Sequence, residues 1–96
     1  MISKIIPDCD RFNGKIGISL QNENSCSCMR MKFNNPKVVK HPSCTILIGR
    51  GDAEACISTA DIEKIDEYDI GDGCKAYNIL YKTSRDLISI VMKSVS

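Results

Sequence analysis

Residues 75–95 read KAYNILYKTSRDLISIVMKSV, and this stretch decides the fold class. Side chains alternate between the two faces of an extended backbone, which places Tyr77, Ile79 and Tyr81 together on one face of a strand. The polar run TSRD predicts a turn, after which residues 87–95 return as a second strand. That second strand is apolar on both faces, which predicts a central strand covered on both sides.

Further strands are predicted upstream of this hairpin. Each has either apolar and polar residues in alternation or a high content of β-branched residues, which suit a pleated, half-buried surface. They cover residues 15–20, 27–33, 38–41, 44–48 and 53–57.

One short helix is predicted near residues 59–68. Ser58 and Asp61 match a loose capping box, and Ile62 and Ile65 lie at helical spacing. Glycines soon after the segment are typical of a helix end. The sequence therefore predicts an α+β fold with a single domain over residues 1–96, mainly an antiparallel sheet, open or partly closed into a barrel.

Length and composition restrict the class of protein. The chain has 96 residues, of which 43% are hydrophobic and 26% charged, which excludes wholesale disorder and allows one domain. Lys4 and Pro7 interrupt the first apolar run, so a secretory signal is not predicted. Leu87–Met92, the longest apolar-rich stretch, is too short to span a bilayer. A cytoplasmic protein without membrane contact is expected.

The net charge of +1 is the sum of two oppositely charged segments. Residues 24–51 carry five bases and no acid, whereas residues 52–72 carry eight acids and only Lys64 as a base. The two segments either lie side by side and neutralise each other, or they form a dipolar surface that sets the rate and register of binding to a partner.

The sequence shows no cofactor fingerprint and no catalytic set, so we expect a non-enzymatic binding module. A small inhibitor or adaptor that occludes a protein partner is the function expected, a profile also typical of inhibitors encoded by phages and other mobile elements. A nucleic-acid or phosphate ligand on residues 30–50 is the alternative. The candidate binding residues are Arg30, Lys32, Lys37, Lys40, Arg50, Asp61, Glu63, Asp66 and Glu67.

The six cysteines are an unusually high number for a chain of this length. In a reducing compartment they are expected to be thiols packed in the core, and disulfides between them are an alternative. Cys26, Cys28, His41 and Cys44 provide an alternative, because thiolate and imidazole are the ligands that zinc prefers. Such a site would stabilise a nucleic-acid-binding domain. A cysteine enzyme using Cys44 with His41, the single histidine, is a third hypothesis.

Overall fold

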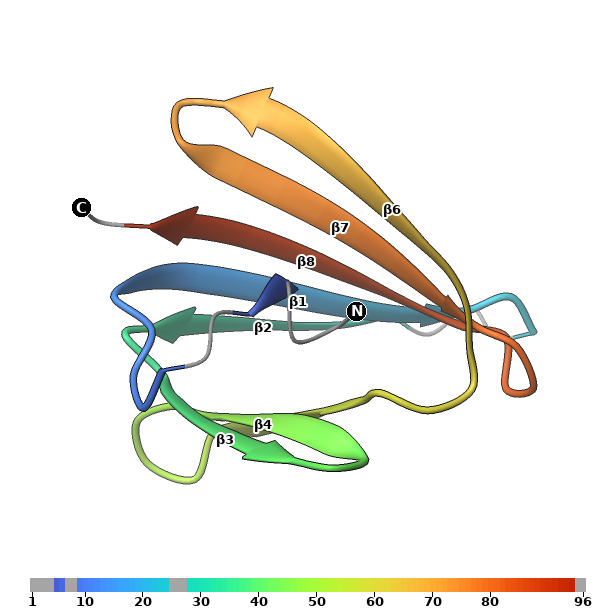
Figure 1. The fold of residues 1–96 in the computed structure, drawn as a ribbon, viewed down its shortest axis with the longest axis horizontal. Helices are drawn as coiled ribbons and strands as arrows, with labels where there is room; N and C mark the ends of the chain where they lie inside the picture. The colour runs from blue at the N-terminus through green and yellow to red at the C-terminus, as the bar shows by residue number, and fades with distance from the viewer. Residues whose placement is uncertain (1–4, 7–8, 25–27, 95–96) are drawn as a thin grey trace.

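The described residues form eight strands in two antiparallel sheets that face each other (Figure 1). The computed structural model describes residues 5–6, 9–24 and 28–94. The strands are β1 (Gly14–Asn22), β2 (Cys28–Asn34), β3 (Lys37–His41), β4 (Cys44–Ile48), β5 (Glu54–Ser58), β6 (Ile62–Gly71), β7 (Cys74–Tyr81) and β8 (Asp86–Ser94). The larger sheet has the order β2-β1-β8-β7-β6, and the smaller has the order β3-β4-β5. The C-terminal hairpin and the strands predicted upstream are confirmed among these residues, with Ala53 just before β5. Ser27, the start of one predicted strand, lies outside the described residues.

The predicted helix near residues 59–68 is wrong, because this segment forms the edge strand β6. Ile62 pairs with Tyr81 and Ile65 pairs with Ile79, so three steps along β6 match two steps along β7. The extra residue makes a β-bulge, which shifts the alternation by one position. Ile62 and Ile65 therefore share a face at a spacing of three, the same spacing that a helix would produce.

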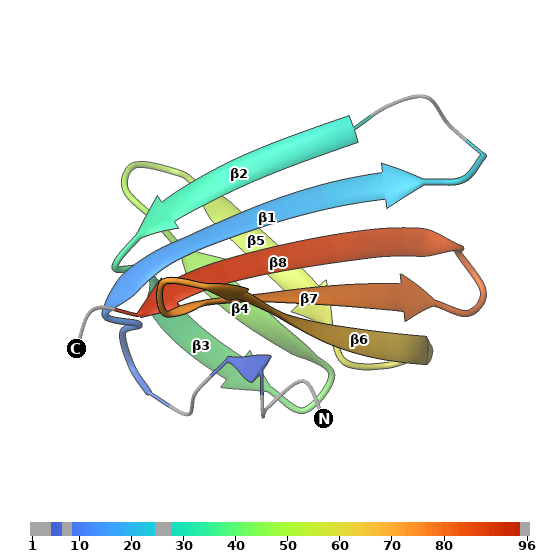
Figure 2. The ribbon, with the colours of Figure 1, turned by 90° about the horizontal axis from the view of Figure 1, so that it is seen from above.

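The fold class is thus nearly all β rather than α+β. Every secondary-structure element among the described residues is a strand. The sheets do not close into a barrel, since β2 and β6 are opposite edges of the larger sheet and do not pair with each other (Figure 2). In the described part of the chain, no helix has the length and hydrophobicity needed to cross a membrane.

β8 is central in the larger sheet, as its apolar sequence predicts, with β1 on one side and β7 on the other. The prediction that both of its faces are covered is wrong. Ile88, Ile90 and Met92 face the smaller sheet, whereas Val91 lies on the outer face and is 41% exposed. Within the described residues, no element lies over this outer face of the five-stranded sheet.

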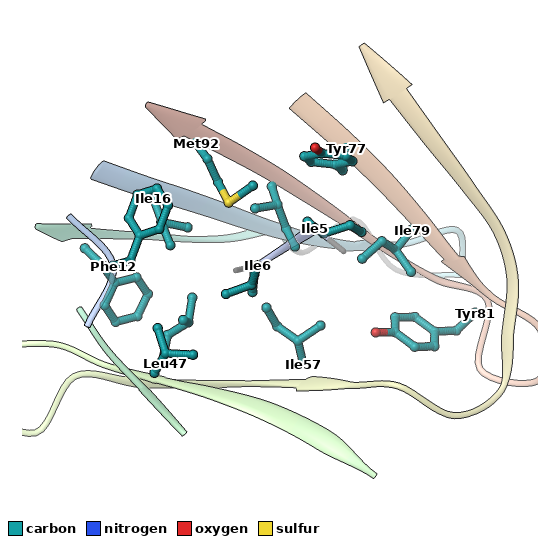
Figure 3. Close-up of a cluster of buried hydrophobic side chains, with 13 residues drawn as sticks. Ile5, Ile6, Phe12, Ile16, Leu47, Ile57, Tyr77, Ile79, Tyr81 and Met92 are labelled. Atoms are coloured by element: carbon teal, nitrogen blue, oxygen red, sulfur yellow. The ribbon is translucent and has the colours of Figure 1, made fainter. Parts of the chain in front are cut away.

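The core lies between the two sheets and includes the N-terminal segment (Figure 3). Ile5 and Ile6, which we call the N-terminal wedge, are 5% and 0% exposed. They lie between side chains of the larger sheet, such as Ile79, and those of the smaller sheet, such as Ile57. Lys40 on β3 donates a hydrogen bond from its Nζ to the Ile6 carbonyl oxygen at 2.7 Å, which fixes the wedge to the smaller sheet.

The two sheets are also joined where β5 leads into β6. The Tyr81 hydroxyl donates to the Ser58 carbonyl oxygen at 2.7 Å, and burial raises the pKa of Tyr81 to about 12. Asp61, with a φ of 62°, turns the chain towards the larger sheet. Its carboxylate accepts a hydrogen bond from the Thr83 backbone N–H at 2.9 Å. This contact ties the crossing between the sheets to the β7–β8 turn.

Candidate functional site

Four exposed cations lie together on the outer face of the larger sheet, and we call this group the basic face. Strand register defines it, because side chains of paired residues point to the same side. Lys15 on β1 lies opposite Lys93 on β8, and on β2 the basic residues lie opposite Gly17 and Ser19 of β1. The basic face consists of Lys15, Arg30, Lys32 and Lys93.

Small side chains leave a shallow depression in the middle of this surface. Gly17 and Ser19 on β1 and Ser89 on β8 line it, together with the stems of Arg30 and Lys32. Its volume is about 150 Å³. The basic face is therefore a flat, slightly hollowed surface that suits a broad partner better than a deeply enclosed small molecule.

The cations of the basic face are not neutralised by their neighbours. The ion pairs formed between described residues involve Lys64, Lys75 and Arg85, and none involves the basic face. Lys15 and Lys93 are moreover directly opposite each other, an arrangement of like charges that costs free energy in a sheet. The repulsion would be relieved by an anionic partner.

The remaining predicted basic residues lie elsewhere. Lys37 begins β3 on the smaller sheet, and Arg50 lies in the β4–β5 turn. Lys40 is half-buried and holds the N-terminal wedge, which gives it a structural contact. The block that is continuous in sequence is therefore divided among separate parts of the fold, because β2 and β3 belong to different sheets.

The predicted acidic residues lie along β6 and the turn before it, and we call them the acidic edge. Most have local partners. Glu63 accepts a hydrogen bond from Arg85 at 3.0 Å. The Glu67 carboxylate lies 3.7 Å from the Lys75 ammonium group, and the Asp66 carboxylate lies 3.6 Å from that of Lys64. The acidic edge consists of Asp61, Glu63, Asp66 and Glu67.

The two edge strands of the larger sheet, β2 and β6 (Figure 2), carry opposite charges. β2 carries Arg30 and Lys32, while β6 carries three members of the acidic edge, and three strands separate them. The acids find their partners on β6 itself, on β7 and in the β7–β8 turn instead of in the basic segment. Across the described residues the larger sheet is therefore polarised from one edge to the other.

The structure does not gather the candidate zinc ligands. Cys26 lies outside the described residues, Cys28 is on the larger sheet, and His41 pairs with Cys44 on the smaller one. No three His, Cys, Asp or Glu side chains of the described part of the chain are placed to hold a metal ion. The zinc site stays a prediction without structural support.

The sequence predicts thiols packed in the core, but none of the five described cysteines is fully buried. Cys28 and Cys56 are exposed, and Cys9, Cys44 and Cys74 are half-buried, with Cys9 packed against the core. Cys44 and Cys56 are diagonal neighbours on the outer face of the smaller sheet. Their mutual hydrogen bond, partial burial and nearby negative charges raise the pKa of the Cys56 thiol. An activated cysteine nucleophile has a lowered pKa, so the raised pKa of Cys56 is the opposite of what such a role requires.

Replacing Cys44 with alanine should therefore make Cys56 more reactive. The substitution removes the main cause of the raised pKa, which increases the thiolate fraction near neutral pH. We expect alkylation of Cys56 by iodoacetamide to accelerate roughly threefold, measured by peptide mass spectrometry. Cys28, on the other sheet, is the internal control. An unchanged rate at Cys56 would show that the two thiols do not interact in solution.

Sequence reasoning missed three cations that belong to charged surfaces of the fold: Lys15, Lys93 and Arg11. Two of them could have been found from the alternation of inward-facing and outward-facing side chains along a strand. Lys15 and Lys93 alternate with the inward-facing Ile16 and Met92, so each lies on the outer face of its strand. Arg11 precedes the first strand and carries no such signal.

Comparison of the chain with protein-family models, with curated proteins and with solved structures finds no match.

Proposed function

We propose that this chain is a non-catalytic binding module that docks an acidic protein surface on its basic face. The observation that carries the proposal is the placement of Lys15, Arg30, Lys32 and Lys93 on one uncovered sheet face, without a described carboxylate paired to any of them. Such a surface attracts an acidic partner over several ångströms and fixes its orientation at contact.

The basic face is a better candidate than the acidic edge. Glu63, Asp66 and Glu67 already have cationic neighbours, and a partner would have to compete with those contacts. Arg30 and Lys32 meet no such competition among the described residues. Exposed ion pairs contribute little to stability, so unpaired cations can be kept on a surface at low cost when a partner uses them.

A protein partner is favoured over a nucleic acid because the basic face lacks aromatic rings. Single-stranded nucleic acids are held by bases stacked on exposed aromatic side chains. Phe33, next to Lys32 in sequence, points into the core and is only 2% exposed. Tyr68 is 48% exposed but lies on β6, at the other edge of the sheet. The flat face between them offers small polar side chains instead.

The double substitution Arg30→Glu and Lys32→Glu tests this function. Reversing two of four cations should weaken binding of a fluorescein-labelled polyglutamate peptide about tenfold or more, measured by fluorescence anisotropy at low salt. Both side chains are exposed, so the thermal midpoint should change little. The matched control is Lys75→Glu with Lys82→Glu, which changes the net charge equally on β7 and its turn.

Two results would contradict the proposal. Equal losses in the two double variants would mean that net charge alone drives binding. Tighter binding of a single-stranded oligonucleotide than of polyglutamate at the same ionic strength, lost on substitution of Arg30 and Lys32 and weakened steeply by added salt, would instead identify a nucleic acid as the partner.

A further inference from the structure

A second cationic site lies where the N-terminal segment, the β2–β3 turn and the β4–β5 turn meet. It is a hollow of about 440 Å³, within the range of small-molecule sites. Arg11, Lys37 and Arg50 contribute three positive charges, and no carboxylate among the described residues lines the hollow. The other lining residues are Asn34, Asn35, Ile48 and Gly49.

Backbone pairing holds two of these cations directly opposite each other. Arg11 and Lys37 form an antiparallel bridge. It is flanked by hydrogen bonds from Phe12 N to the Pro36 carbonyl at 2.9 Å and from Val38 N to the Asp10 carbonyl at 2.8 Å. Like charges opposite each other in a β pair are destabilising. The fold therefore keeps an electrostatic repulsion here that a bound anion would relieve.

The orientation of Arg11 and the two turns complete the hollow. Arg11 donates from Nη1 to the Asn35 carbonyl oxygen at 2.7 Å, which orients its guanidinium group and leaves other N–H donors for a ligand. Asn35 is itself held in place, because its Oδ1 accepts a hydrogen bond from the Gly14 backbone N–H at 2.9 Å. Gly49 leaves room beside Phe33, because a Cβ at this position would come within 2.9 Å of the ring.

We propose that this hollow binds a phosphomonoester, the phosphate group lying among Arg11, Lys37 and Arg50. A dianionic phosphate has the charge and the oxygen acceptors to satisfy three cations. The planar guanidinium group of an arginine can donate two parallel hydrogen bonds to its oxygens. The hollow is larger than a phosphate group, and Ile48 provides an apolar contact for the attached organic group. None of its residues belongs to the basic face, so this site is independent of the proposed protein-binding function.

Titration with phenyl phosphate, followed by backbone and arginine side-chain NMR signals, tests the site. We expect shifts at Arg11, Gly49 and Arg50, and an affinity at least tenfold higher than that for benzoate, which has the same ring and one negative charge. A phosphoserine peptide forms the second arm. Affinity equal to that of phenyl phosphate assigns the site to small phosphate esters, and tighter binding assigns it to phosphorylated protein.

Variants separate this site from general attraction of anions. Lys37→Gln with Arg50→Gln should reduce phenyl phosphate affinity at least tenfold, whereas the control Arg30→Gln with Lys32→Gln should leave it within twofold. Because Lys37→Gln removes the repulsion from Arg11, the ligand-free variant should melt at the same temperature as the parent or higher. Equal losses in the two double variants, equal affinity for benzoate, or shifts confined to the basic face would overturn the proposal.

Discussion

Replacing Ile6 with alanine should lower the free energy of unfolding by about 3 kcal/mol. Ile6 is 0% exposed in the N-terminal wedge, and its truncation would leave a cavity between two sheets that cannot easily move together. A chain of this length has a total stability of only about 5–14 kcal/mol, so the loss is a large share. Urea unfolding monitored by circular dichroism measures it, and the thermal midpoint should fall by about 15 °C.

Ile70→Ala is the matched control for this prediction. The chemical change is identical, but Ile70 on β6 is 56% exposed, and we expect its effect on unfolding to stay within about 0.5 kcal/mol. If Ile6→Ala were no more costly than Ile70→Ala, the wedge would not be packed between the sheets in solution.

Gly14→Ala should be at least as damaging, at about 3–5 kcal/mol. Gly14 opens β1 with a φ of 151°, which side chains rarely tolerate, and an added Cβ would come within 2.2 Å of the Lys93 carbonyl oxygen. That oxygen belongs to the backbone of β8, so the clash can be relieved only by separating two central strands. Chemical unfolding gives the measurement.

Gly17→Ala provides the comparison three residues along the same strand. A Cβ at Gly17 would meet nothing closer than the Val91 carbonyl oxygen at 4.0 Å, so alanine fits without strain. Alanine is also favoured over glycine inside a strand, and we expect this variant to be neutral or more stable by up to about 1 kcal/mol. Similar losses at Gly14 and Gly17 would contradict the close approach of β1 and β8.

The strands could be predicted from sequence where alternation is regular. Tyr77, Ile79 and Tyr81 face the core in alternation as expected, because β7 pairs without interruption along this stretch. The same rule fails on β6, where the bulge near Ile62 produces helical spacing in a strand. A single inserted residue changes the phase, and nothing in the local residue types distinguishes that shift from a helix.

The candidate site was only partly predictable for a different reason. Charge counts along the chain identify a basic segment and an acidic segment, but not which strands neighbour each other. Arg30 and Lys37 are close in sequence and belong to different sheets, whereas Lys15 and Lys93 are far apart in sequence and lie opposite each other. Strand order is a tertiary property, and it determines which charges share a surface.

The pairing of β1 with β8 also has a consequence for how the chain acquires its structure. Gly14 pairs with Ser94, so one of the central contacts of the larger sheet joins its first strand along the chain to its last. Such distant contacts slow folding, because a long loop must close before they form. During synthesis on the ribosome, β1 can pair with β2 early but waits for β8 until all the strands from β2 to β7 have been added. Until then its second edge is available to other chains, and the nascent protein is most prone to aggregate at this stage.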